Sequence, residues 1–94
     1  MTDHMVTVAF TGEPEAALLP AERERLKELA DGGVVRAAYL SADRSQAWLV
    51  VRGDGPKAVG GAMESLPLYP YMEVRGISEA RRIAVAPADG ADRS

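Results

Sequence analysis

The pattern of apolar and polar positions along the chain predicts six short elements of secondary structure. Clusters of β-branched and aromatic residues indicate strands, and apolar residues that recur every three or four positions indicate helices. The predicted elements are a strand at 5–10, a helix at 20–31, strands at 34–42 and 45–52, a helix at 56–66 and a strand at 69–77. The order βαββαβ is that of a ferredoxin-like α+β domain, with two helices on one face of a four-stranded antiparallel sheet.

Prolines and glycines set the predicted helix boundaries. Pro20 and Pro56 suit the first turn of a helix, where the N–H that proline lacks has no partner within the helix. Gly32 ends the first helix and Pro67 ends the second. The expected buried stripes are Leu26, Leu29 and Ala30 on the first helix, and Val59, Met63 and Leu66 on the second.

The two central strands form a predicted hairpin whose register follows from pairing Ala42 with Ser45. On one face the expected partners are Tyr39 with Trp48, Ala37 with Val50, and Val35 with Arg52. On the other face they are Leu40 with Ala47, Ala38 with Leu49, and Arg36 with Val51. Neither face is polar enough to lie in water, so we expect the helices to cover the aliphatic face and a second copy of the chain to cover the Tyr39/Trp48 face.

Length and composition place the chain among small single-domain proteins. Its 94 residues suffice for one core, which we assign to residues 1–85, and the Ala/Asp/Gly-rich segment 86–94 is expected to be a flexible tail. The net charge is −3 and basic residues alternate with acidic ones, which argues against nucleic-acid binding. The longest apolar run, 47–51, is too short to span a membrane, and no secretion signal precedes Met5, so we expect a cytoplasmic protein.

Residue types that commonly carry metal or thiol chemistry are scarce. The chain has no cysteine, which excludes disulfides and thiolate catalysis. Its single histidine, His4, leaves no imidazole cluster for a metal site and is expected to be exposed near the N-terminus. We therefore expect no metal site.

The segment 66–72, Leu-Pro-Leu-Tyr-Pro-Tyr-Met, resembles the Leu-Pro-Leu-Phe-Pro-Tyr-Met signature of the muconolactone isomerases. Only Tyr69 departs from that signature, and the change is conservative. The segment 33–40 aligns without gaps to Gly-x-Trp-Arg-His-Leu-Trp-Arg of the same family, and the similarity runs from about Leu19 to Ile77. Because the signature joins a helix end to a strand start, it is informative about the fold more than about catalysis.

This resemblance implies a dimeric α/β barrel, in which a homodimer that can assemble further works without a cofactor. The family's reaction moves a proton between two carbons of an unsaturated lactone that carries a carboxylate. One general base can perform both transfers if its pKa is tuned toward neutrality, and a cationic residue can hold the carboxylate and stabilise the enolate-like charge. The ligand that the resemblance implies is a small, anionic organic molecule.

Charged residues near the start of the first helix are the candidate catalytic groups. The inward stripe, continued backward from Leu26, reaches Glu22 and Arg23. The family has an acidic-basic-acidic cluster at this point, and the sequence Glu-Arg-Glu resembles it, which makes Glu22 the candidate base and Arg23 a candidate cation. Glu24 and Glu73 are the alternative bases. The competing interpretation is that these are solvated first-turn carboxylates, which the helix dipole favours.

Arg36 and Tyr39 are the candidate substrate-binding residues. Arg36 matches an arginine of the family, and on the helix-covered face it either lines a pocket or forms a salt bridge at the sheet edge. Tyr39 pairs with Trp48 across the hairpin, either in dimer packing or in stacking on a ligand. The family's second arginine is replaced by Leu40, and Arg44 replaces a family histidine in the turn, where we expect it to be solvated.

Two other function classes stay open. A barrel that keeps only one of the family's two anion-binding arginines, because Leu40 replaces the other, can serve as a non-catalytic ligand-binding or assembly module. Related dimeric barrels also host cofactor-free and haem-dependent oxygenation, and the fold alone does not assign an activity. Haem is disfavoured because His4 is the one imidazole of the chain. If the chain is an enzyme, the resemblance implies an isomerase of aromatic catabolism.

Overall fold

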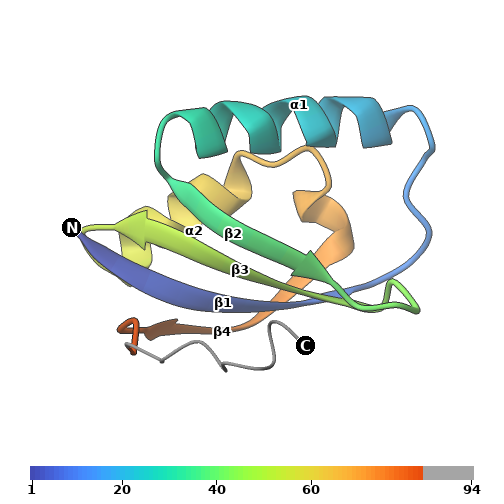
Figure 1. Cartoon of the computed structure of the whole chain (residues 1–94). Helices are drawn as coiled ribbons and strands as arrows, with labels where there is room; N and C mark the ends of the chain where they lie inside the picture. Colours follow the sequence, from blue (N-terminus) through green and yellow to red (C-terminus); the bar gives the residue numbers. More distant parts are fainter. Residues whose placement is uncertain (84–94) are drawn as a thin grey trace, which may run out of the picture.

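The computed structural model describes residues 1–83, which form a sheet with two helices on one side of it (Figure 1). The elements are β1 (Thr2–Phe10), α1 (Leu18–Asp31), β2 (Val35–Leu40), β3 (Gln46–Gly53), α2 (Pro56–Glu64) and β4 (Met72–Glu79), with a 3₁₀ turn at Tyr69–Tyr71. Neighbouring strands are antiparallel, and their order across the sheet is β2-β3-β1-β4. The predicted α+β fold is confirmed, and its topology is consistent with a ferredoxin-like domain. The predicted domain end at residue 85 and the tail at 86–94 lie outside the described residues.

The helix-covered side of the sheet is built from alternate residues of the two central strands. β1 contributes Val6 and Val8 and β3 contributes Leu49, because successive side chains of a strand point to opposite faces. α2 adds the fully buried Val59 and packs closely on the end of β3: a Cβ added to Gly53 would lie 3.1 Å from Val59 Cγ2. The aliphatic face of the hairpin therefore lies under the helices, as the sequence predicts.

The opposite face of the sheet carries large apolar side chains and has no helix over it within the described residues (Figure 1). Met5 and Tyr39 are 39% and 66% exposed, and Trp48 and Val50 are half-buried. This is the face that the sequence analysis assigns to a second copy of the chain. That assignment stays a prediction.

The register of the β2–β3 hairpin follows the prediction near the turn and departs from it at the far end. Tyr39 opposes Trp48, and the flanking predicted pairs at 37, 38 and 40 are also present. The predicted partners of Val35 and Arg36 are wrong, because a β-bulge between Val35 and Ala37 brings Val35 opposite Val51. The extra residue lets Val35 enter the core while the Arg36 head group stays in solvent, which avoids burying an unpaired charge.

The N-terminal strand is longer than predicted, and this changes the position of the histidine. β1 begins at Thr2 instead of Met5, which places His4 in register with Val6 and Val8 on the helix-covered face. The expectation that His4 is exposed is wrong, since it is only 3% exposed. Its Nδ1 lies 3.1 Å from the carbonyl oxygen of Thr2, so a partner is present for the buried ring.

The last predicted strand begins later than expected. Residues 69–71 form a 3₁₀ turn, in which the Tyr69 N–H donates to the Leu66 carbonyl and the Tyr71 N–H donates to the Leu68 carbonyl, over 2.9 and 2.8 Å. Pro70 lies in this turn, where its missing N–H is not needed. β4 therefore starts at Met72, and the turn brings the chain from the end of α2 back to the sheet.

Candidate functional site

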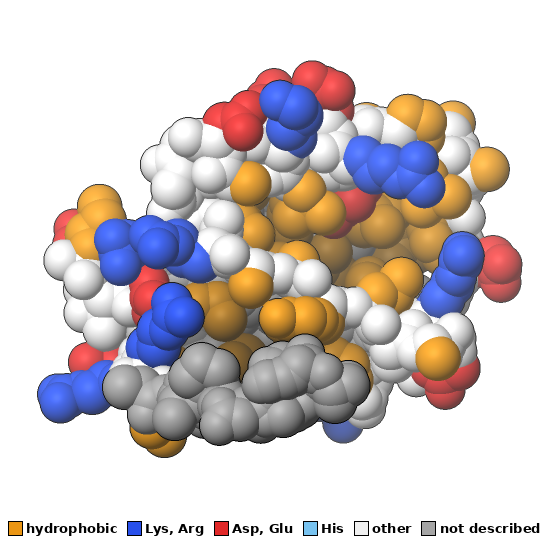
Figure 2. Space-filling view, viewed as in Figure 1, with side chains coloured by type: hydrophobic (Ala, Val, Ile, Leu, Met, Phe, Trp, Pro, Cys, Tyr) orange, Lys and Arg blue, Asp and Glu red, His pale blue; other side chains and the backbone are white. Residues whose placement is uncertain are grey.

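A cavity of about 310 Å³ lies between α1 and the sheet, at the end of the sheet that carries the β2–β3 turn. Most of its wall is apolar and includes Val8, Phe10, Leu26, Leu66 and Met72. Figure 2 shows it as an apolar hollow beneath α1, with an acidic side chain inside it and Lys or Arg side chains on its rim. Its volume lies at the lower end of the range for small-molecule sites.

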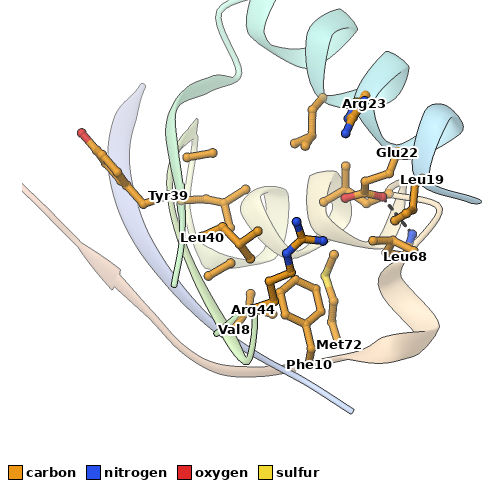
Figure 3. Close-up of a pocket in the computed structure, with 15 residues that line it drawn as sticks. Val8, Phe10, Leu19, Glu22, Arg23, Tyr39, Leu40, Arg44, Leu68 and Met72 are labelled. Atoms are coloured by element: carbon orange, nitrogen blue, oxygen red, sulfur yellow. Dashed lines mark hydrogen bonds between the residues drawn. The ribbon is translucent and has the colours of Figure 1, made fainter. Parts of the chain in front are cut away.

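Glu22 is the carboxylate of this cavity, and α1 positions it there. Glu22, Leu26 and Leu29 stand four and three residues apart, so the three side chains share the inward face of the helix. Glu22 is 8% exposed, and its Oε1 accepts a hydrogen bond of 2.9 Å from the Leu68 N–H (Figure 3). Burial raises the pKa of the Glu22 carboxyl above its ordinary value, and the hydrogen bond from Leu68 offsets part of that rise.

For Glu22, the interpretation as a solvated first-turn carboxylate is wrong. α1 begins at Leu18, two residues earlier than predicted, and this puts Glu22 in the second turn. The side chain consequently lies over the sheet and not at the exposed helix N-terminus. Its charged form is held by a single backbone N–H in apolar surroundings.

The segment that connects α2 to β4 supplies the hydrogen bond to Glu22. Pro67 has no N–H, and the N–H groups of Tyr69 and Tyr71 are used within the 3₁₀ turn. The Leu68 N–H is left to donate to Glu22, 46 residues away along the chain. The segment that resembles the family signature therefore holds the candidate base as well as forming the turn, a role that the sequence analysis missed.

Two arginines border the cavity. Arg23 follows Glu22 on α1, and Arg44 comes from the turn between β2 and β3. Figure 3 shows the Arg44 guanidinium pointing into the cavity from the hairpin side. None of the ion pairs found within residues 1–83 includes Arg23 or Arg44. The sequence predicts that Arg44 is solvated. The residue is indeed exposed, but it also lines the cavity, which was not predicted.

The turn that carries Arg44 is closed by hydrogen bonds of its neighbours. Asp43 Oδ1 accepts hydrogen bonds from the Ser45 hydroxyl at 2.7 Å, the Ser41 hydroxyl at 2.8 Å and the Ser45 N–H at 3.0 Å. These hydrogen bonds lower the pKa of the Asp43 carboxyl to about 2, and the two from Ser45 have the largest effect. Arg44 itself has a φ of 63°, a left-handed conformation that costs a residue with a Cβ about 1–2 kcal/mol.

Arg36 and Tyr39 are not brought together with Glu22 and Arg23. Arg36 is exposed at the β-bulge and borders two other hollows of the surface, whereas it does not line the cavity that contains Glu22. Tyr39 lies at the edge of that cavity, but its ring points away from it (Figure 3). The cation on the sheet side of the cavity is therefore Arg44, in place of the predicted Arg36.

The two alternative bases lie elsewhere. Glu24 is exposed on α1 and does not line the cavity. Glu73 is exposed on β4, where Arg75 pairs with it over 3.1 Å. Among the three candidate carboxylates, only Glu22 combines burial with contact to the cavity.

Neither a metal site nor a membrane span is found in the described part of the chain. No group of three or more His, Cys, Asp or Glu side chains there is arranged to hold a metal ion. None of the helices there is long and apolar enough to cross a membrane.

No protein-family model matches the chain, and no curated protein matches it. The arrangement combines one buried carboxylate of raised pKa, an apolar wall and two cations at the mouth. Such an arrangement suits proton transfer to and from carbon in a small anionic molecule.

Proposed function

We propose that this chain is a cofactor-free isomerase that acts by proton transfer on a small anionic lactone or a related organic acid. The observation that carries the proposal is the buried Glu22 carboxylate, held at Oε1 by the Leu68 N–H in an apolar cavity. A carboxylate desolvated in this way is a stronger base than one in water, because its protonated form is favoured. The resemblance to the muconolactone isomerases supports the same reaction class.

In the proposed reaction, Glu22 removes a proton from a carbon activated by the lactone carbonyl, either next to it or on the far side of the conjugated double bond. The electron pair of that C–H bond moves into the conjugated system and gives an enolate-like anion, and the carboxylate becomes a carboxylic acid. The carboxylic acid exchanges its proton with solvent and then donates a proton to another carbon of the conjugated system, so the double bond shifts and no oxidant or reductant is consumed. The arginines at the mouth, Arg23 and Arg44, stabilise the negative charge of the bound ligand.

Deuterium incorporation tests this reaction class directly. We expect the protein to catalyse exchange of carbon-bound hydrogen when small unsaturated lactones that carry a carboxylate are incubated with it in D₂O. Exchange is read by proton NMR as the loss of the signals of hydrogens on the carbons that the carbonyl activates, directly or through the double bond, with the lactone alone as the control. If binding occurs but no lactone exchanges above the control, the isomerase proposal fails.

Muconolactone itself is expected to be a poor substrate. Leu40, which lines the cavity, stands where the family has an arginine, and removing a charge-assisted contact to a carboxylate costs about 1.5–3 kcal/mol, roughly ten- to a hundredfold in rate. A direct assay beside a muconolactone isomerase measures the difference. Leu40→Arg restores the family residue at a position that is 55% exposed, and it should recover part of the rate. Family-like turnover by the unmodified chain would show that Leu40 is no defect.

We also propose that the functional unit is a homodimer joined through the open face of the sheet. The apolar side chains Met5, Tyr39, Trp48 and Val50 support this, because a contiguous apolar face without a helix over it is typical of an interface. A symmetric dimer covers the same patch on both chains. Such a dimer closes the two sheets against each other and leaves the Glu22 cavity on the helix side of each sheet.

A non-catalytic ligand-binding module is the second candidate, and Leu40 is the observation that favours it. An apolar side chain at that position widens the apolar wall and removes a cation from the family's clamp. A binding module and an isomerase differ in one measurable property. The binding module takes up small carboxylates without deuterium exchange, whereas the isomerase exchanges carbon-bound hydrogen in a reaction that needs Glu22.

A further inference from the structure

The residue at position 44 is unusual for its backbone conformation. Arg44 is the one residue other than glycine with a positive φ among residues 1–83, at 63°. Glycine and asparagine are the residues that usually occupy this left-handed region, because a Cβ approaches the following carbonyl oxygen there. A long, charged side chain at such a position requires an explanation outside the turn itself.

The turn does not need the Arg44 side chain in order to close. Asp43 and Ser41 provide the side-chain acceptors, and the Arg44 backbone N–H donates to the Ser41 carbonyl over 2.9 Å. None of the hydrogen bonds found within the described chain uses the Arg44 guanidinium. Glycine at position 44 would make the same backbone hydrogen bond with less strain.

The guanidinium instead points into the Glu22 cavity (Figure 3). Among residues 1–83, Glu22 is the only carboxylate that lines this cavity. Its Oε1 accepts a hydrogen bond from Leu68, and none of the ion pairs found there joins it to Arg44. Arg44 and Glu22 also come from opposite sides of the cavity, the first from the β2–β3 turn and the second from α1. Both border the same cavity, whose other lining residues include Leu26, Leu66 and Met72.

We propose that Arg44 is the anion anchor of this site, and that the ligand is a small acid whose carboxylate lies at the hairpin end while its apolar body extends along the wall toward Glu22. The guanidinium presents paired N–H donors that match a carboxylate. This inference rests on the proposed function for the role of Glu22 alone, since the anchor itself requires only binding. In the related family an arginine stands at the position of Leu40, on strand β2. We place the corresponding cation in the turn, at Arg44, so the site would bind an anion of different shape.

Binding of a minimal carboxylate tests the anchor without any turnover. Hexanoate and its neutral counterpart hexanamide are titrated into the full chain, and Kd is measured by NMR chemical shifts. In Arg44→Gly we expect the Kd of hexanoate to rise about ten- to a hundredfold, with little change for hexanamide. Arg44→Lys keeps the charge but not the paired donors, so its Kd for hexanoate should lie between that of the unmodified chain and that of Arg44→Gly.

Two controls separate the anchor from general effects. Arg75→Gln removes one positive charge from β4, outside the cavity, and should leave the Kd of hexanoate within about twofold of the unmodified chain. Arg44→Gly should unfold at the same or a higher denaturant concentration than the unmodified chain, because the strained φ of 63° is relieved. Loss of binding then reflects the missing guanidinium and not loss of the fold.

The outcomes that overturn the anchor are distinct from those that overturn the isomerase. Arg44 is not the anchor if the unmodified chain fails to bind hexanoate, if Arg44→Gly binds it unchanged, or if Arg75→Gln weakens binding equally. If Arg44-dependent binding is present while no lactone exchanges deuterium, the anchor stands and the isomerase proposal fails. If exchange occurs in Arg44→Gly with an unchanged KM, the isomerase stands and the anchor fails.

Discussion

Glu22→Gln is expected to lower the rate of lactone isomerisation, or of deuterium exchange, by about 10²- to 10⁴-fold. The amide keeps the shape of the carboxyl group, and its oxygen can accept the Leu68 N–H that Glu22 Oε1 accepts over 2.9 Å. It cannot take a proton from carbon at neutral pH, so the base is lost while the cavity keeps its form. Steady-state rates of the two proteins at the same pH give the ratio.

The same substitution has an expected signature in stability. Burial raises the pKa of the Glu22 carboxyl in the folded chain above 4.5, its ordinary value and the one expected in the unfolded chain. The folded chain therefore binds the carboxyl proton more tightly than the unfolded chain does. The favourable contribution of Glu22 is fully present below pH 4.5 and is lost as the pH rises through the raised folded pKa. Urea unfolding should therefore show Glu22→Gln gaining stability relative to the unmodified chain between pH 4 and pH 7.

Glu24→Gln is the matched control on the same helix. Glu24 is exposed, lies outside the cavity and is two residues from Glu22, so its substitution should leave the rate within about twofold. Retained activity in Glu22→Gln would contradict the assignment. Loss of activity in Glu24→Gln or Glu73→Gln would move the base to that residue.

Trp48→Ala is expected to dissociate the proposed homodimer or to unfold the chain. Truncating a well-buried aromatic side chain costs roughly 3–5 kcal/mol, and Trp48 lies at the centre of the face that the proposed dimer buries, opposite Tyr39 and Thr7. Sedimentation at micromolar concentration should show a dimer or a larger assembly for the unmodified chain. For Trp48→Ala it should show a monomer or an unfolded chain.

Tyr39→Lys distinguishes dissociation from unfolding. Tyr39 is 66% exposed in the single chain, so a lysine there costs little within the fold, but in the dimer it would bury a charge. We expect a folded monomer by circular dichroism and sedimentation. A stable dimer in both Trp48→Ala and Tyr39→Lys, or a monomer of the unmodified chain with Trp48 open to quenchers, would show that the open face is not the interface.

The fold could be predicted to the extent that local signals agree with one another. Alternation in the β2–β3 hairpin and the turn at Asp43 gave the correct partners from Ala37 to Leu40. The bulge at Arg36 was not predictable, because periodicity assumes one residue per step and a bulge inserts an extra one. His4 was misplaced because Asp3 is a weak strand former that interrupts the local strand signal, and pairing with β3 extends β1 over Thr2 and Asp3.

The candidate site could be predicted in part. Helical periodicity placed Glu22 on the inward face of the first helix, and the structure places it in the cavity. The Leu68 N–H carries no signal in the sequence, because any residue other than proline at position 68 would offer the same donor. Arg44 was predicted to be solvated because a turn residue is expected to point into solvent, and its place at the cavity depends on the closed turn and its left-handed φ.

The shape of the turn between β2 and β3 does not depend on the side chain that the turn presents to the cavity. Asp43, Ser41 and Ser45 keep the loop in shape by hydrogen bonds in which the side chain at position 44 takes no part. Whatever residue stands at 44 is consequently presented to the cavity mouth without cost to the rest of the fold beyond its own backbone strain. A substitution at position 44 is therefore expected to change the charge and size of the cavity mouth while the turn and the rest of the fold stay the same.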